Sequence, residues 1–269
     1  MTDFEWPKTV PEWRDRCWKQ EGSRPYDLWK PEPLQKFFRV HGYILWLSEY
    51  ERGLGDQNVN LFPPNDKPRR PDGFTFISRY QCEPGIYIHK PRFGHVNNIH
   101  CPARTIYNQD VLVRVVSIEG DATGDAHYEA LRRLSAGQTA FRGDNHALPP
   151  LNEFEFNGFR FVIFPLLSFG YIPWFYNVDE ILDYLVQIFT GIKFCHDHSI
   201  AHLDLDSDNI QFNFFGARTD PDGTTEPNVT GPFRSHFPIR YYINDFEMVV
   251  CFHKDSDPAT RKITGLPNV

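Results

Sequence analysis

The chain has 269 residues, of which 41% are hydrophobic and 23% charged, so it is long enough for one large domain or two small ones with an ordinary core. Its net charge of -7 offers no basic excess to neutralise phosphates, which argues against nucleic acid and against anionic membranes as partners. A nucleotide that brings its own magnesium ion is compatible with this charge.

The cysteines are odd in number and lack the spacing of metal ligands: Cys17, Cys82, Cys101, Cys195 and Cys251. We therefore expect reduced, structural thiols and a cytoplasmic or nuclear location. The N-terminus has neither a basic start nor an apolar core, and no segment approaches the length that spans a membrane.

Residues 1–72 form an extension that is rich in proline and holds five of the six tryptophans: Trp6, Trp13, Trp18, Trp29 and Trp46. The run Thr9 to Glu12 predicts the capped start of a short helix. A second apolar cluster runs from Leu34 to Trp46. These aromatic side chains could bind a partner or attach the extension to the main domain, and the prolines of 62–72 predict a linker.

The middle of the chain alternates strand and helix signals. Strand-like runs occur at 74–77, 86–88 and 111–116, and the segment 125–134 has the spacing of a helix. Two alternating stretches around Asn157-Gly158 carry the strongest short-range hairpin signal.

A long helix is predicted from Asn177 to about His198. Asn177 is a good N-cap, Glu180 occupies the third helical position, and apolar residues follow at helical spacing. We expect this helix to be a buried scaffold for the residues that follow it.

The most informative stretch reads H-L-D-L-D-S-D-N at residues 202–209, which has the spacing H-x-D-x-x-x-x-N. In a catalytic loop of this spacing, Asp204 would accept a hydroxyl proton and the amide oxygen of Asn209 would ligate magnesium on a nucleotide. A strand-like run over 239–243 leads into N-D-F-E, where Asp245 would supply a second metal-binding carboxylate.

On these two motifs the chain resembles the protein kinase superfamily, with D-F-E in the place of D-F-G. The wording I-A-H-L-D at 200–204 and Y-Y-I-N-D-F-E at 241–247 looks like the divergent kinase-like proteins of mushroom-forming fungi. The resemblance covers roughly residues 85–269. It implies an α+β, two-lobe fold: a small antiparallel-sheet lobe at 73–167 and an incomplete helical large lobe at 168–269 that ends within the activation segment.

The resemblance also implies ATP and magnesium as cofactors and gives roles to residues outside the two motifs. Arg114 stands for the strand lysine that holds the phosphates, and Glu129 for its glutamate partner. Gly94 lies where a glycine-rich phosphate loop belongs, although no G-x-G-x-x-G is present. The carbonyl of Pro165 and the amide of Leu167 would face the adenine edge.

Two of these roles have structural alternatives. Arg114 could instead be a solvent-facing strand residue, and Glu129 could instead pair with Arg133 one helical turn away.

Several departures from the kinase pattern argue against catalytic turnover of ATP. Leu203 replaces an arginine that reads a phosphorylated activation loop, Asp206 replaces a lysine that neutralises the transferring phosphate, and Glu247 replaces a glycine. Three functions therefore stay open: a divergent kinase that phosphorylates protein hydroxyls, an inactive pseudokinase that binds a protein partner, and a small-molecule kinase of the choline or aminoglycoside type.

The large lobe that the resemblance implies lacks the helices that would follow residue 269. We expect part of the apolar face of the 177–198 helix to be exposed as a result. The chain would then self-associate, lean on its N-terminal extension, or be unstable.

Overall fold

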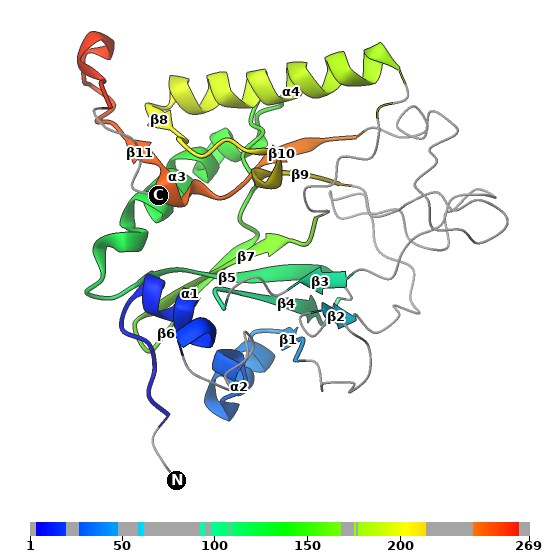
Figure 1. The fold of residues 1–269 in the computed structure, drawn as a ribbon, viewed down its shortest axis with the longest axis vertical. Helices are drawn as coiled ribbons and strands as arrows, with labels where there is room; N and C mark the ends of the chain where they lie inside the picture. Colours follow the sequence, from blue (N-terminus) through cyan, green and yellow to red (C-terminus); the bar gives the residue numbers. More distant parts are fainter. Residues whose placement is uncertain are drawn as a thin grey trace, which may run out of the picture. The chain divides into compact units, whose positions relative to one another are not determined.

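The computed structural model describes residues 4–19, 27–47, 59–61, 92–94, 98–107, 109–167, 175, 177–213 and 239–263. The protein is a mixed α+β structure with a curled antiparallel sheet and several helices (Figure 1). It divides into two compact units, the first made of 1–82, 88–125 and 150–166, and the second of 83–87, 126–149 and 167–269. The strands predicted at 74–77 and 86–88 and the linker at 62–72 lie outside the described residues.

A five-stranded antiparallel sheet organises the first unit, in the order β1-β4-β5-β7-β6. Its strands are β1 (Tyr43–Leu45), β4 (His100–Thr105), β5 (Asp110–Ile118), β6 (Asn152–Phe156) and β7 (Phe159–Pro165). The central strand β5 is buried along almost its whole length, which its Val-rich sequence favours. A separate ladder pairs β2 (Val59–Leu61) with β3 (Arg92–Gly94).

The predicted hairpin is confirmed. Strands β6 and β7 are joined by Asn157 and Gly158, whose φ angles of 50° and 77° are both positive. A two-residue turn of this kind matches the twist of the flanking strands and needs residues that tolerate the left-handed region.

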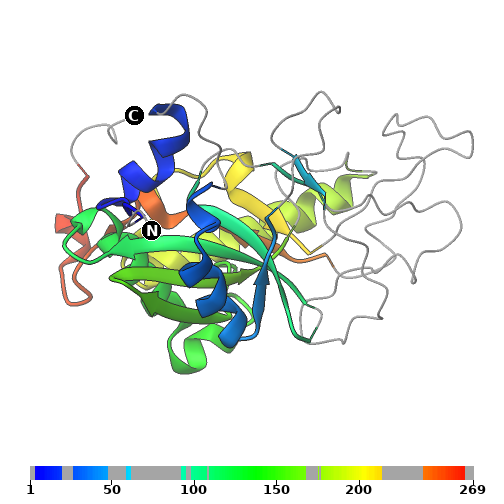
Figure 2. The same cartoon turned by 90° about the horizontal axis from the view of Figure 1, so that it is seen from below.

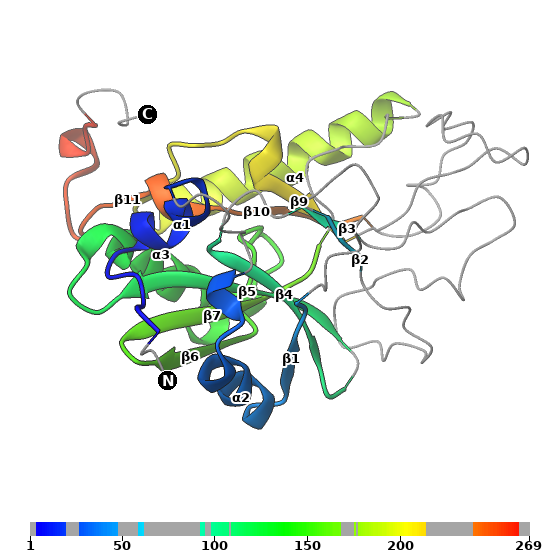
Figure 3. The ribbon, with the colours of Figure 1, turned by 60° about the horizontal axis from the view of Figure 1, so that its bottom comes forward.

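Helices α1 (Val10–Lys19) and α2 (Glu32–Val40) pack on the sheet, as Figures 2 and 3 show in blue. The predicted start of α1 is confirmed, because Glu12 N–H donates to Thr9 Oγ1 at 3.1 Å. Trp13 and Trp29 are fully buried in the core beside sheet residues such as Phe161. The extension is thus attached to the sheet through its tryptophans, and it also supplies the edge strand β1.

One backbone carbonyl joins the two buried tryptophans. The indole N–H groups of Trp13 and Trp29 both donate to the carbonyl of Asn98, at 2.9 and 2.7 Å. Asn98 lies two residues before β4, and its own side chain is completely buried. The N-terminal segment is therefore tied to the start of a sheet strand by hydrogen bonds as well as by apolar contact.

The second unit contains α3 (Asp125–Ser135) except for its first residue, α4 (Val178–Asp197) and two short antiparallel ladders. One ladder pairs β8 (Ile200–Ala201) with β11 (Val250–Cys251), and the other pairs β9 (Ile210–Phe212) with β10 (Tyr241–Ile243). Among the described residues, short 3₁₀ helices are Asp27–Trp29, Ala122–Gly124, Gly137–Phe141, Ser207–Asn209, Phe246–Met248 and Pro258–Thr260.

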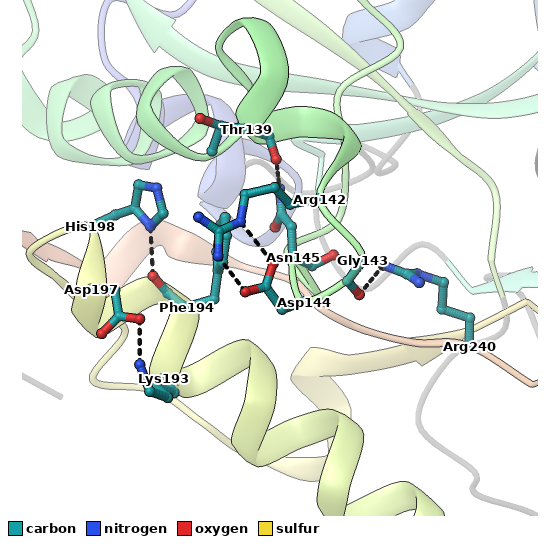
Figure 4. Close-up of polar contacts among 10 residues, drawn as sticks. All are labelled: Thr139, Arg142, Gly143, Asp144, Asn145, Lys193, Phe194, Asp197, His198 and Arg240. Carbon is teal, nitrogen blue, oxygen red and sulfur yellow. Dashed lines mark hydrogen bonds and ion pairs between the residues drawn. The ribbon is translucent and has the colours of Figure 1, made fainter.

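Both predicted ends of α4 are confirmed. Asn177 Oδ1 accepts from Glu180 N–H at 2.9 Å, and His198 closes the C-terminus with a 2.7 Å bond from its ring to Phe194 O (Figure 4). One side of α4 packs on β10, where the rings of Tyr184 and Tyr241 are 4.9 Å apart. The expectation that part of the apolar face of α4 is exposed is confirmed, because Phe189 and Val186 are more than 60% exposed, so the helix is not a wholly buried scaffold.

Polar contacts fix the segment that follows α3 (Figure 4). Asn145 Nδ2 donates to the carbonyls of Leu134 and Thr139, and Arg240 Nη2 donates to the carbonyls of Gly143 and Asn145. The residues before β10 are thereby joined to the end of α3, so the second unit is held together by more than its two ladders.

Two remaining expectations concern thiols and membranes. The cysteines whose side chains are described, Cys101, Cys195 and Cys251, are free thiols, and burial raises the pKa of Cys195 to about 12. Among the described helices, none has the length and apolar character needed to cross a bilayer.

Candidate functional site

Two loops of the second unit carry the predicted motif residues. The loop from His202 to Asn209 connects β8 to β9, and the turn that begins at Asn244 connects β10 to β11. Because β8 pairs with β11 and β9 pairs with β10, the ends of one loop lie beside the ends of the other. The ladder pairing therefore brings together two sequence segments that are about 40 residues apart.

Asp204 and Asn209 are joined directly. Asn209 Nδ2 donates to Asp204 O at 2.8 Å and to Asp204 Oδ2 at 3.0 Å. The carboxylate of Asp204 is exposed, whereas Asn209 is half-buried. Because the Nδ2 end of the amide is engaged by Asp204, its Oδ1 end is the one that would meet a cation.

The backbone of Asn244 links the second loop to the first. Asn244 N–H donates to Asn209 O at 2.8 Å, and Asn244 O accepts from His202 Nε2 at 2.8 Å. Asp245 therefore follows directly after a residue that is bonded to both ends of the His202–Asn209 loop. The arrangement places Asp245, the predicted second carboxylate, next to the loop that carries Asp204.

His202 is a neutral, buried anchor. Its Nε2 is bonded to a carbonyl, and its Nδ1 accepts from Asp204 N–H at 3.3 Å, which together require the tautomer protonated on Nε2. Burial lowers the pKa of His202 below its ordinary value, and it outweighs the Asn244 bond and the charges of Asp245 and Asp204, which act in the opposite direction. Its ring also contacts the buried ring of Phe246 at 4.8 Å.

Backbone strain occurs at two positions of this site. Leu203 and Asp245 have φ angles of 67° and 60°, in the left-handed region that residues other than glycine rarely adopt. Each such conformation costs on the order of 1–3 kcal/mol and persists where surrounding contacts hold it, most often at functional sites. Here the flanking ladders and the bonds of His202 and Asn244 supply those contacts.

Asp206 has a structural role in this loop. Its carboxylate accepts from Asp208 N–H at 3.1 Å and from Ser207 Oγ at 3.0 Å, which caps the 3₁₀ turn Ser207–Asn209. The backbone bond from Asp208, followed by the Ser207 hydroxyl, lowers the pKa of Asp206. Asp206 stands where the kinase resemblance implies a lysine, and its carboxylate instead shapes the turn that carries Asn209.

The predicted phosphate pair lies on elements of different units. Arg114 is on β5 and only 2% exposed, so the alternative of a solvent-facing strand residue is wrong. Glu129 is on α3, where it forms the alternative i,i+4 pair with Arg133 at 2.8 Å. Arg133 also donates to Phe252 O at 2.7 Å. A pair between Glu129 and Arg114 stays a prediction.

Besides Arg114, three residues are predicted to hold the nucleotide, and they lie in or next to strands. Gly94 ends β3, where it pairs with Val59, and the residues that follow it, 95–97, lie outside the described part. Pro165 ends β7 opposite Val111 in β5, and both Pro165 and Leu167 are buried. Their contacts with an adenine ring stay a prediction.

Two residues of this site were not assigned a role from the sequence. His202 belongs to the motif, but its function as an anchor depends on where its ring nitrogens point. Asn244 contributes through its backbone N–H and C=O. Backbone groups carry no residue-type signature, so only its place before Asp245 could have indicated it.

The donor set fits magnesium only in part. Within the described ranges, no three His, Cys, Asp or Glu side chains gather to form a metal site. Magnesium is commonly held by one or two carboxylates together with substrate phosphates and water, so Asp245 and the Asn209 amide oxygen suit an ion that arrives with a nucleotide.

No family model matches the chain. No curated protein matches it either.

Proposed function

We propose that the second unit holds a magnesium-nucleotide site of the protein-kinase type, and that the chain transfers the terminal phosphoryl group of ATP to a protein hydroxyl. The observation that carries this proposal is the pair of hydrogen bonds that the Asn209 side chain donates to Asp204. Asp245 directly follows Asn244, whose N–H donates to the carbonyl of Asn209. The two-lobe kinase fold and the likeness to fungal kinase-like proteins belong to the same proposal.

The residues of the chain have distinct tasks in this reaction. Asp204 is exposed and fixed by Asn209, so it can orient an incoming hydroxyl and accept its proton. His202 is bonded to the carbonyl of Asn244 and to the N–H of Asp204, so it holds the loop that carries the Asp204 carboxylate. Magnesium, when bound with the nucleotide, would neutralise charge on the phosphates, and Asn209 and Asp245 are the residues that would hold it.

Nucleotide binding without phosphoryl transfer is the second candidate function. It is favoured by Asp206, which places a carboxylate where a kinase has a lysine and is committed to the cap of the loop turn. A negative charge there opposes the charge of a transferring phosphate. In this case the chain would be a pseudokinase that binds a protein partner.

The test is a transfer assay with labelled ATP, magnesium, generic protein acceptors and a panel of small alcohols and amines. Asp204→Asn should lower transfer by about 100-fold or more, since a positioned base contributes on the order of 10² to 10⁴ in rate. Asp208→Asn is the matched control, because it removes the same charge from an exposed position in the same loop. Its rate should stay within about two-fold of the parent, because its carboxylate has no part in the proposed chemistry.

The outcomes separate the functions. Transfer to proteins that depends on Asp204 supports the kinase proposal, and transfer confined to small molecules moves the assignment to the choline or aminoglycoside type. Nucleotide binding without transfer favours the pseudokinase. Equal rates for Asp204→Asn and the parent would contradict the proposed catalytic role.

A further inference from the structure

The ladder of β9 and β10 has two faces, and helix α4 packs on one of them (Figure 1). On this face the ring of Tyr241 meets the Tyr184 ring of α4 at 4.9 Å, and Ile243 Cδ1 lies 3.0 Å from the place that a Cβ on Gly191 would take. Successive residues of a strand point to opposite faces. Gln211 lies between the β9 partners of Tyr241 and Ile243, so its side chain is on the face away from α4.

The face away from α4 runs into the candidate site. Gln211 pairs with Tyr242, and the same register continues to Asn209, whose carbonyl accepts from Asn244 N–H at 2.8 Å. Asn209 and Gln211 are two residues apart, so they lie on the same face at a spacing of about 7 Å. The proposed magnesium ligand and Gln211 therefore belong to one surface.

Gln211 has an unused hydrogen-bond donor on this surface. Its side chain is only 1% exposed, and its Nε2 is buried with no acceptor among the described residues. Its neighbours differ, since Asn213 Oδ1 accepts from Arg240 N–H at 3.0 Å and Asn209 Nδ2 donates to Asp204. Native proteins leave few buried donors unpaired, so the Gln211 amide calls for an acceptor that the folded chain does not supply.

We propose, on the basis of the nucleotide site proposed above, that Gln211 binds the base of the nucleotide and makes the site selective for adenine. With the phosphates and magnesium at Asn209, the base lies further along the same face, beside Gln211. A glutamine amide pairs with adenine through two hydrogen bonds, because Nε2 donates to N7 and Oε1 accepts from the N6 amino group. Guanine has acceptors at both N7 and O6, so it would set O6 against Oε1.

Burial makes this contact selective. A site that holds a buried polar group for one ligand rejects an analogue that lacks the partner atom, because the buried group is then left unpaired. The analogue 7-deaza-ATP has a C–H in place of N7 and keeps the phosphates that bind magnesium. It should therefore bind about 10-fold more weakly than ATP, and GTP should bind more weakly than ATP by at least about the same factor.

Calorimetric titration of the full chain with ATP, 7-deaza-ATP and GTP, each with magnesium, tests the proposal. Gln211→Met keeps the length of the side chain and removes its amide, so it should bind ATP about 10-fold more weakly and no longer distinguish ATP from 7-deaza-ATP. Its thermal midpoint without nucleotide should not fall, because the donor that it removes has no acceptor. The comparison of ATP with 7-deaza-ATP on the parent does not depend on how any variant folds.

Gln187→Met is the matched control. It makes the same substitution on the α4 side of the ladder, where Gln187 donates to Ile239 O at 3.0 Å and accepts from Tyr241 N–H. Its ratio of affinities for ATP and 7-deaza-ATP should equal that of the parent.

The outcomes separate this role from the nucleotide site itself. Equal affinities of the parent for ATP and 7-deaza-ATP would overturn the role of Gln211 and leave the nucleotide site standing. An unchanged ratio in Gln211→Met would do the same. A parent that binds none of the three nucleotides would overturn the nucleotide site and the role of Gln211 with it.

Discussion

Asn209 holds Asp204 at two atoms, the backbone carbonyl at 2.8 Å and the carboxylate at 3.0 Å, through one side-chain amide. The last residue of the His202–Asn209 loop is therefore bonded to its third residue, Asp204. The exposed carboxylate of Asp204 keeps a fixed orientation as a result. The flanking ladders β8–β11 and β9–β10 and the hydrogen bonds of Asn244 hold this loop from outside.

Replacement of Asn209 by alanine should release this carboxylate. We expect Asn209→Ala to lower the free energy of unfolding by about 1 kcal/mol, the usual net value of a protein hydrogen bond. It should weaken magnesium-dependent nucleotide binding far more than Ser207→Ala, which alters the same exposed turn. Calorimetric titration with ATP checks this, and equal affinities for the two variants would argue against Asn209 as a ligand.

Acidification should destabilise the protein before its carboxylates titrate. Burial lowers the folded-state pKa values of His202 and His146 below their ordinary value near 6.5, so the unfolded chain binds protons first as the pH falls. Stability is then complete above about pH 6.5 and declines below it, by up to about 1.4 kcal/mol per pH unit for each proton.

Urea unfolding between about pH 5 and 8 measures this loss. The slope of the free energy of unfolding against pH should be smaller in His202→Gln, because that variant removes one of the two buried histidines. A profile identical to that of the parent would mean that His202 is not buried in its neutral form.

The two indole bonds to Asn98 should be coupled. Either Trp13→Phe or Trp29→Phe leaves the carbonyl of Asn98 with one donor, and each should cost about 1–2 kcal/mol of stability. The double variant leaves a buried carbonyl without either donor, so its cost should exceed the sum of the single costs. Trp6→Phe is the control, since Trp6 joins the same cluster through ring contacts. Additive effects in chemical denaturation would contradict the shared acceptor.

Two glutamines beside β10 should respond in opposite ways to the same substitution. Within the part of the chain that the structure describes, Gln211 Nε2 is buried without a hydrogen-bond acceptor, so Gln211→Met should raise the free energy of unfolding by about 1 kcal/mol. Gln187 donates to Asp183 and Ile239 and accepts from Tyr241 N–H, so Gln187→Met should lower it. Thermal and urea unfolding of the pair decide the matter, and destabilisation of both would show that Gln211 is satisfied in solution.

The elements that the sequence predicts well are those with local signals. The Asn157-Gly158 turn and the Asn177 cap depend on neighbouring residues, so the β6–β7 hairpin and the start of α4 are confirmed. The pairing of β1 with β4 and the indole bonds to Asn98 join residues that are distant in sequence, and no local pattern indicates them.

The candidate site likewise combines features that have a local sequence signal with features that distant contacts determine. The spacing of Asp204 and Asn209 predicts that they act together, and the structure brings them into direct contact. The exposed face of α4 was expected in part, although its apolar spacing alone favours a buried helix. The left-handed backbone of Leu203 and Asp245 could not be predicted, because leucine avoids that region and aspartate adopts it only occasionally, so tertiary contacts impose it.

The most direct test of the proposed nucleotide site is the thermal midpoint with and without millimolar ATP and magnesium, for the parent and for Asp245→Asn. Asparagine tolerates the left-handed backbone of position 245 and removes only the charge, so this variant should fold normally. A ligand that binds only the folded state raises its stability by mass action. The proposed site predicts a magnesium-dependent rise for the parent that Asp245→Asn loses. No rise in the parent at millimolar nucleotide would contradict it.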